Sequence, residues 1–229
     1  MFIQQFFDSR ERLAVALADA IARDLRGAID ARGHATLVAS GGSSPIATYR
    51  ALAARELDWS RVTILPSDER WVDEQHEDSN IGMLRRELQR GKASKAKLVS
   101  LYDKSAELDH AAQRISARVD ELPRPFDVAL LGMGDDGHTA SLFPDAPSIE
   151  TDLASHDSCV LVQPPSQPLA RISLTPAALL DARAIRLVFF GQAKADVFAK
   201  ASADGDLKSL PVRSVLRQEI VPLTTYFAL

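Results

Sequence analysis

The sequence of 229 residues contains a single cysteine, Cys159, so no disulfide can form within the chain. A chain without disulfides fits a reducing compartment, and we expect a cytoplasmic protein. The first residues, MFIQQFFDSRERL, are apolar only briefly and lack the pattern of a signal peptide. No window reaches the roughly 18 apolar residues that a membrane span needs. The sequence therefore predicts neither export nor insertion into a membrane.

An excess of positive charge is also missing. The chain has 27 Lys and Arg residues against 31 Asp and Glu residues, which gives a net charge of −4. No basic stripe and no alternation of basic and aromatic residues is present, and this argues against binding to nucleic acid. An acidic protein that binds an anion must do so with a few cations placed together. Clustered Arg and Lys residues are therefore informative here.

What the chain does have is an alternation of apolar runs with amphipathic stretches. The patterns predict helices over 10–31, 46–56, 79–88 and 108–122, and strands over 35–40, 62–72, 126–134, 159–163, 171–175, 185–191 and 224–229. Several strands are continuous apolar runs, which is typical of a parallel sheet covered on both faces. The segment 145–175 is rich in proline, and we expect it to add an antiparallel strand or two at an edge. We predict an α/β fold with a mostly parallel sheet, in one domain over residues 1–229.

The run SGGSSP follows the first of these apolar strands and leads into a helix. In open α/β sheets, ligands bind beyond the carboxyl ends of the strands. Gly41 and Gly42 allow the backbone to approach a ligand closely, and Ser43 and Ser44 add hydroxyl donors. The following helix directs free N–H groups toward an anion. The alternative is a plain turn with a serine cap, and neither the P-loop nor the dinucleotide pattern fits the run.

The run LLGMGDDGHTASLFP, over 130–144, places glycines and carboxylates directly before a histidine. Its G-x-G-x-x-G spacing matches the dinucleotide pattern nominally, but no acidic residue ends a clear strand about 20 residues later. We interpret it as a loop whose Gly134 and Gly137 bring backbone against a substrate and which aims His138 at it. The alternative is a structural histidine at a helix cap. The other histidines form no HxH or HExxH pattern, so no metal site is predicted.

Further charged residues follow or begin the other predicted strands. Asp68 and Arg70 lie at the end of one strand, Arg171 begins another, and Lys194 follows a third. Taken one at a time, each cation is most simply a solvated surface side chain, and Asp68 is equally suited to a helix cap. Because they are expected at one edge of the sheet, we predict that they form one site with the two glycine-rich loops.

Six motifs then occur in an order and spacing that resemble the 6-phosphogluconolactonase family: SGGSSP, SDERWV, DSNIGML, LLGMGDDGHTASLFP, RISLTP and FGQAKADVF. The resemblance covers about residues 40 to 220. It implies a modified Rossmann-like three-layer sandwich, similar to glucosamine-6-phosphate deaminase and ribose-5-phosphate isomerase. The implied reaction is hydrolysis of 6-phospho-D-glucono-1,5-lactone to 6-phosphogluconate in the oxidative pentose phosphate pathway, without a metal or an organic cofactor.

The resemblance also implies roles for individual residues. His138 matches the catalytic histidine and Asp136 the aspartate of the DGH motif, and Asp68 matches the polar end of the DER strand. The substrate and its phosphate would be bound by Gly41, Gly42, Ser43, Ser44, Arg70, Arg171 and Lys194. Ser44 stands where threonine is commoner and Asp73 where proline is expected, and neither change removes one of these roles.

Two other functions compete with this one. A glucosamine-6-phosphate deaminase or related isomerase would use the same loop and His138, but the deaminases carry an acidic residue in a motif resembling GHIAFNEP. Here the segment reads GHTASLFP, with Phe143 at that position. A sugar-phosphate sensor without catalysis usually carries a helix-turn-helix extension, for which the predicted elements leave no room. We expect a small sugar-phosphate lactone as the partner, and a monomer or small homo-oligomer.

Overall fold

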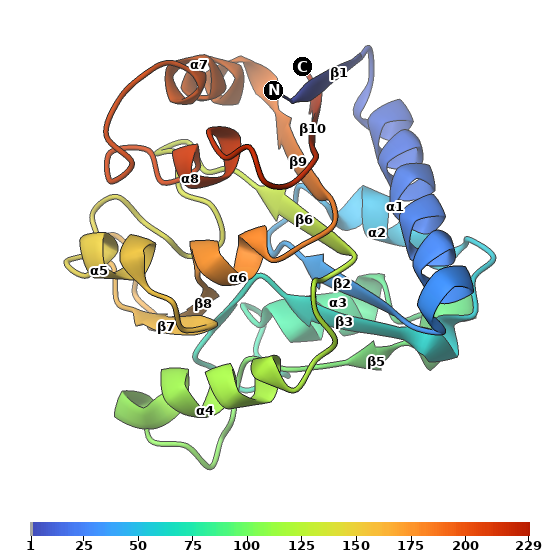
Figure 1. Cartoon of the computed structure of the whole chain (residues 1–229), viewed down its shortest axis with the longest axis horizontal. Coiled ribbons are helices and arrows are strands. Elements are labelled where there is room, and N and C mark those ends of the chain that lie inside the picture. Colours follow the sequence, from blue (N-terminus) through green and yellow to red (C-terminus); the bar gives the residue numbers. More distant parts are fainter. Residues whose placement is uncertain (1) are drawn as a thin grey trace.

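The computed structural model describes residues 2–229, and its core is a seven-stranded parallel sheet (Figure 1). The strand order is β1-β10-β9-β6-β2-β3-β5. These strands are β1 (Ile3–Phe7), β2 (Ala35–Ala39), β3 (Val62–Pro66), β5 (Lys97–Leu98), β6 (Val128–Gly132), β9 (Ile185–Phe190) and β10 (Leu223–Ala228). The prediction of an α/β fold with a mostly parallel sheet is confirmed.

A second, antiparallel sheet has the order β4-β8-β7. It consists of β4 (Asp68–Arg70), β7 (Cys159–Val162) and β8 (Arg171–Leu174). The predicted antiparallel strands in the proline-rich segment are therefore present. They do not extend an edge of the large sheet, because they pair with β4 and form a sheet of their own.

Helices pack on both faces of the large sheet (Figure 1). One face carries α1 (Arg10–Arg32), α2 (Ile46–Ala53) and α3 (Asn80–Glu87). The other carries α4 (Leu108–Asp120), α6 (Pro176–Leu180), α7 (Gly191–Ser202) and α8 (Arg213–Leu216), together with the small sheet. The remaining helices are α5 (Ile149–Ala154) and the 3-10 turns Trp59–Arg61 and Gly91–Lys95. Neighbouring residues of one strand serve opposite cores, as Leu37 and Val38 do, so the three-layer arrangement is confirmed.

The helix α1 shows why the sequence pattern predicted α1 to α4, whereas α5 to α8 were not predicted. Its leucines and isoleucines recur every four residues, and the stripe Leu13, Leu17, Ile21 is fully buried. The side chain of Ser9 accepts a hydrogen bond from the backbone N–H of Arg12 at 3.2 Å and so caps the start. Gly33 ends the helix.

The predicted single strand over 62–72 is wrong, because the chain divides at Ser67 into β3 and β4. Ser67 joins the two sheets: its N–H donates to the Ala39 carbonyl and its own carbonyl accepts from the Leu174 N–H, each at 2.9 Å. Pro66, which has no N–H to donate, ends β3 in the large sheet. The DER segment thereby leaves the large sheet at its carboxyl edge, close to where the glycine-rich loops emerge.

Strand β1 was not predicted at all. It pairs with β10 at the edge of the sheet, and Ile3 to Phe6 are all exposed. With neither face of the strand buried, the segment carries no alternation of apolar and polar residues to indicate it.

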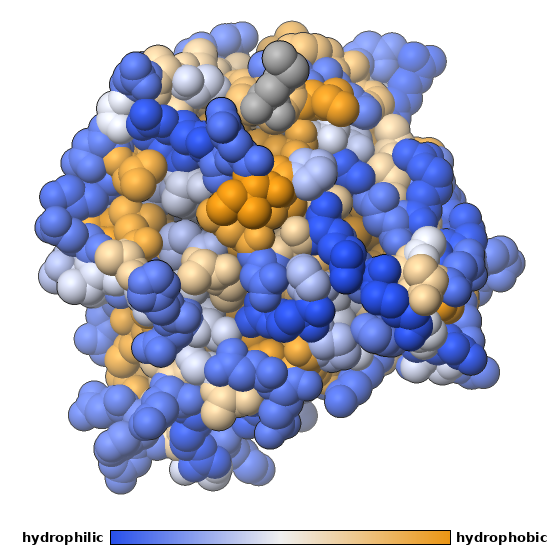
Figure 2. Space-filling model, viewed as in Figure 1, coloured by the Kyte–Doolittle hydropathy of each residue, from blue (hydrophilic) through white to orange (hydrophobic). Residues whose placement is uncertain are grey.

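The surface of the protein is mostly polar on the face seen in Figure 2. Figure 2 shows polar and charged side chains over most of the face in view, with apolar side chains in separate patches. Across residues 2–229, each helix is too short or too polar to cross a lipid bilayer.

Candidate active site

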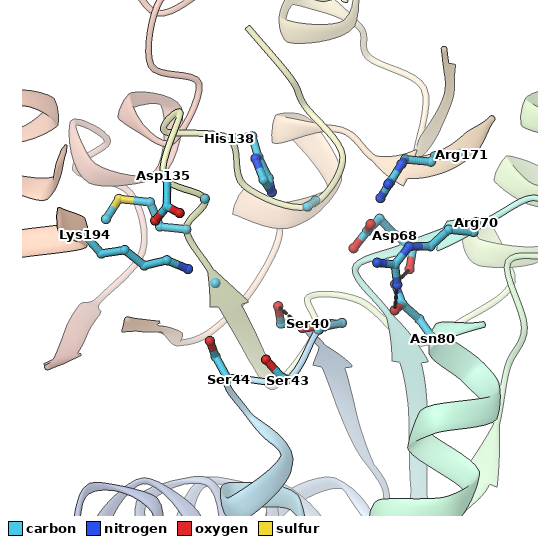
Figure 3. A pocket seen from close by; sticks show the side chains of 16 residues that line it. Ser40, Ser43, Ser44, Asp68, Arg70, Asn80, Asp135, His138, Arg171 and Lys194 are labelled. Carbon is cyan, nitrogen blue, oxygen red and sulfur yellow. Dashed lines mark hydrogen bonds between the residues drawn. The ribbon is translucent and has the colours of Figure 1, made fainter. Parts of the chain in front are cut away.

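A cavity of about 320 Å³ opens at the carboxyl edge of the large sheet (Figure 3). Ten of the predicted site residues line it: Gly41, Gly42, Ser43, Ser44, Asp68, Arg70, Gly134, His138, Arg171 and Lys194. Segments far apart in the sequence therefore meet at one place, as the rule for open α/β sheets requires. The lining also contains Ser40, Asn80, Gly132, Met133, Asp135 and Ala140, which the sequence analysis did not select.

The floor of the cavity is the loop between β2 and α2. Gly42 adopts a φ of 78°, a left-handed conformation that favours glycine. Ser43 and Ser44 point into the cavity (Figure 3). The hydroxyl of Tyr49, in α2, donates to the Ser40 carbonyl at 2.6 Å and holds the loop against the helix.

The start of α2 differs from the serine-capped alternative. Pro45 precedes the helix, and no side chain caps the first turn. The first N–H groups of α2 are therefore not used by a side-chain cap, and the helix end keeps its partial positive charge. This arrangement suits an anion.

His138 projects into the cavity from the loop after β6 (Figure 3). Its Nδ1 lies 2.6 Å from Oδ1 of Asp136, and its backbone N–H donates to the same oxygen at 3.1 Å. The Gly134 N–H donates to the His138 carbonyl at 2.9 Å and closes the loop. Residues 133–144 contain no helix, so the alternative of a helix-capping histidine is wrong.

The protonation of this pair follows from its surroundings. Burial alone would raise the pKa of Asp136, but the hydrogen bond and charge of His138 outweigh it and bring the pKa below its ordinary value. An ionised Asp136 accepts a hydrogen bond from Nδ1–H, which leaves Nε2 as the imidazole's acceptor. Asp136 does not line the cavity. It acts on the site through His138.

Gly134 lies directly under the imidazole ring. A Cβ at this position would come within 2.2 Å of both Cε1 and Nδ1 of His138. We expect Gly134→Ala to separate the ring from Asp136 and to lower kcat roughly 100-fold, as loss of a positioned base would. Steady-state kinetics measure this. Gly27→Ala, with nothing within 4 Å, is the matched control and should leave kcat unchanged. Full activity in Gly134→Ala would contradict the described geometry.

Gly137, predicted to bind substrate, is placed outside the lining. Its φ is 78°, and a Cβ there would come within 2.4 Å of Leu210. The N–H of Val212 donates to its carbonyl at 2.9 Å. Gly137 therefore supports the histidine loop from behind, and its predicted contact with substrate is not supported.

Three cations reach the cavity from different elements: Arg70, Arg171 and Lys194. Arg171 is 7% exposed, its Nη2 donates to Gln167 at 2.7 Å, and its Nε is buried without a hydrogen-bond partner. Desolvation lowers the pKa of this guanidinium. A buried cation with an unsatisfied donor at a cavity favours a bound anion.

Asp68 is held by two hydroxyl groups rather than capping a helix. Ser67 donates to its Oδ1 at 2.9 Å and Ser141 to its Oδ2 at 2.6 Å. Each oxygen keeps a further lone pair for another donor. The carboxylate is thus oriented in the cavity wall, beside the guanidinium of Arg70 (Figure 3).

Glu69, which was not among the predicted site residues, is fully buried behind Asp68. Its carboxylate accepts the N–H groups of Asn80 and Ile81, both at 2.7 Å, at the start of α3. The only signal in the sequence was a carboxylate ten residues before the serine that caps this helix. Glu69 thereby ties the DER strand to α3.

Burial raises the pKa of Glu69 to about 7, although its backbone N–H donors act in the opposite direction. The folded protein then holds a proton that the unfolded chain has released, so stability falls as pH rises from about 4.5 through 7. We expect the free energy of unfolding to drop by up to about 3 kcal/mol over this range relative to Glu69→Gln. Urea unfolding of both proteins at pH 5, 6, 7 and 8 measures it. Parallel pH dependences would contradict the shift.

Two further groups of side chains bear on the chemistry of the chain. Among residues 2–229, no group of three or more His, Cys, Asp or Glu side chains could hold a metal ion. The Cys159 thiol is buried, and burial raises its pKa to about 12. A protonated, inaccessible thiol is unreactive.

Comparison with known proteins shows which proteins this chain resembles. The family model described as glucosamine-6-phosphate isomerases/6-phosphogluconolactonase matches residues 8–223. A 6-phosphogluconolactonase of Pseudomonas aeruginosa is 43% identical over 225 residues, which cover 97% of this chain and 93% of that protein. The crystal structure of a 6-phosphogluconolactonase from Shewanella baltica OS155 superposes with a TM-score of 0.97 at 37% identity, over 100% of this chain and 98% of that one.

A monomeric glucosamine-6-phosphate deaminase shares the fold with a TM-score of 0.83, over 99% of this chain and 97% of that one. At 17% identity it shows the fold alone, and it confirms the expected likeness to the deaminases. The family model matches residues 8–223, and the two lactonases named above cover 97% and 100% of this chain. The chain belongs to the glucosamine-6-phosphate isomerase/6-phosphogluconolactonase family.

Proposed function

We propose that the chain is a 6-phosphogluconolactonase, which hydrolyses 6-phospho-D-glucono-1,5-lactone to 6-phospho-D-gluconate with His138 as the general base. The observation that carries the proposal is the His138–Asp136 pair at 2.6 Å, set in a cavity with a glycine-serine floor and three cations. An imidazole held by a carboxylate can move a proton, and the rest of the cavity can bind a phosphate.

The chemistry needs no strong nucleophile, because a lactone is an activated ester. Nε2 of His138 takes a proton from water as the water oxygen adds to C1, and the carbonyl oxygen becomes an oxyanion. The C1–ring oxygen bond then breaks, the carbonyl re-forms, and the imidazolium returns its proton to the ring oxygen. The acid product loses a proton to solvent. The steps balance without electron transfer, and the proposal includes no metal or organic cofactor, as the family resemblance implies.

The other residues bind and orient the substrate. The Gly41–Ser44 loop, Arg171 and Lys194 hold the phosphate by hydrogen bonds and charge, far from the reacting carbon. Asp68 accepts a hydrogen bond from the attacking water with a free lone pair. Arg70 adds a further cation for the anionic substrate.

Phe143 favours the lactonase over the deaminase. It is buried, and its ring centroid lies 4.2 Å from that of His138. In a deaminase, a carboxylate near this histidine would assist the ring opening and loss of the amine. A phenyl ring offers no proton, and the relatives at 37% identity or more named above are lactonases.

A coupled assay tests the proposal. Fresh lactone is made from glucose 6-phosphate by its dehydrogenase, and 6-phosphogluconate dehydrogenase reports the product as NADPH. The purified protein should accelerate NADPH formation above the spontaneous opening measured without it. If the protein does not accelerate NADPH formation, the proposal is contradicted. Release of ammonia from glucosamine 6-phosphate would favour the deaminase instead.

We further propose that residues 1–229 act as one catalytic domain, because the two largest hydrophobic cores share the strands of one sheet. A cytoplasmic location and a monomer or small homo-oligomer remain predictions that rest on the sequence.

A further inference from the structure

Asn80 occupies a position in the cavity wall that neither the sequence analysis nor the proposed mechanism uses. It is 1% exposed, and it begins α3 directly after Ser79, the residue that caps this helix. It is also the only asparagine in the chain. Because Ser79 already caps the helix, the Asn80 side chain is free for another purpose.

Both ends of the Asn80 amide are used. Its Nδ2 donates to the backbone carbonyl of Asp68 at 2.7 Å, and its Oδ1 accepts from Nη1 of Arg70. The network determines which end of the amide is oxygen, because a guanidinium can only donate and a carbonyl can only accept. A side chain that offers a donor and an acceptor at this spacing fits, and a carboxylate would not.

The same amide packs against the anion-binding loop. A Cβ on Gly41 would come within 2.3 Å of Asn80 Oδ1, so the loop lies directly on the amide. The asparagine is thus fixed between Gly41 on one side and β4 on the other. It has little freedom to rotate, and neither has the Arg70 guanidinium that it holds.

The Arg70 guanidinium is anchored from one side only. Nη1 donates to Asn80 Oδ1 and to the backbone carbonyl of Asp78, the latter at 3.2 Å. Within residues 2–229, Nε and Nη2 make no side-chain hydrogen bond, and Arg70 lines the cavity. The two remaining donors are therefore available to an anion.

We propose that Asn80 is a positioning residue, which orients Arg70 toward the bound sugar phosphate and sets the spacing between Arg70 and the Gly41–Ser44 loop. This inference rests on the proposed function for its kinetic readout. Asn80 does not itself contact the reacting atoms. Its effect on catalysis passes through Arg70.

A double-mutant cycle tests this in the lactonase assay. We expect Asn80→Ala to raise KM roughly tenfold or more, as loss of a hydrogen bond to a charged group would, with a smaller fall in kcat. In an Arg70→Ala background the same change should alter KM less than twofold. Effects that multiply in the double variant, or an unchanged KM in folded Asn80→Ala, would overturn the proposal.

Ser79→Ala is the matched control, because the Ser79 hydroxyl caps the same helix and donates to Glu69 but makes no hydrogen bond to Arg70 or Asn80. It should lower stability by roughly 1 kcal/mol and leave KM within twofold. If Ser79→Ala raises KM as much as Asn80→Ala does, the role is structural and the proposal fails. Should Asn80→Ala not fold, the near-isosteric Asn80→Asp replaces it and should also raise KM, since its oxygen would face the Asp68 carbonyl.

A second readout does not depend on lactonase activity. Because Asn80 is the only asparagine, asparagine-selective ¹⁵N labelling gives a single side-chain amide signal, whose loss in Asn80→Asp confirms its origin. Inorganic phosphate should shift this signal in the wild type and not in Arg70→Ala. An unresponsive signal in the wild type would overturn the proposal. A responsive signal in a protein that leaves the lactone unchanged would support Asn80 and contradict the proposed reaction.

Discussion

Replacing His138 with alanine is expected to lower kcat roughly 10²–10⁴-fold, the range for loss of a positioned general base. The physical reason is the position of the ring: Nδ1 is bound to Asp136, and the opposite edge faces the cavity (Figure 3). KM should change little, because the loop and the cations still bind the phosphate. Steady-state kinetics against the lactone, corrected for spontaneous opening, measure both constants.

Asp136→Asn separates orientation from charge in the same experiment. An asparagine can keep a hydrogen bond to the ring, but it no longer stabilises the imidazolium that forms during the reaction. We expect a smaller fall in kcat than for His138→Ala and no added loss in the double variant. If His138→Ala retains near-normal kcat, the histidine is not the base and the proposed mechanism is wrong.

Arg171→Ala is expected to raise KM roughly 10- to 100-fold, with a smaller effect on kcat. The guanidinium is largely buried, is desolvated and lines the cavity, so a substrate phosphate there would pair with its positive charge. Its Cζ also lies 5.1 Å from the centre of the Phe143 ring, which keeps the side chain in place. A titration of initial rate against lactone concentration gives the two constants separately.

Two variants make this second result interpretable. Arg171→Lys keeps the charge but lacks the planar fork, so it should recover part of the affinity. Arg12→Ala removes an exposed arginine on α1 that is not part of the cavity lining, and it should leave KM unchanged. An unchanged KM in a folded Arg171→Ala protein would remove Arg171 from the phosphate site.

The sequence predicted α1 to α4 and the longer buried strands because local chemistry determines them. Buried parallel strands such as 185–191 appear as apolar runs, and α1 carries both a buried stripe and its own caps. The edge strand β1 could not be predicted from the sequence pattern because its side chains stay exposed. The break at Ser67 was missed because it depends on a partner strand, β8, about a hundred residues later in the chain.

The residues of the candidate site also fall into those that the sequence could predict and those that it could not. His138, the Gly41–Ser44 loop and the three cations could be selected because they lie at the ends of predicted strands, where ligands bind in open α/β sheets. Glu69 and Asn80 could not, because their roles consist of contacts across ten or more residues that no local pattern records. Gly137 lies outside the lining, and in sequence a glycine that packs against Leu210 looks like one that faces a ligand.

The central claim, that this chain opens a sugar-phosphate lactone with His138 as the base, is tested most directly by observing the lactone itself. The C1 signal of ¹³C-labelled 6-phospho-D-glucono-1,5-lactone is followed by NMR in buffer, with wild-type protein and with His138→Ala. The account predicts rapid loss of the lactone signal with wild type and loss near the spontaneous rate with His138→Ala. Equal rates for the two proteins, or a wild-type rate no faster than buffer, would contradict it.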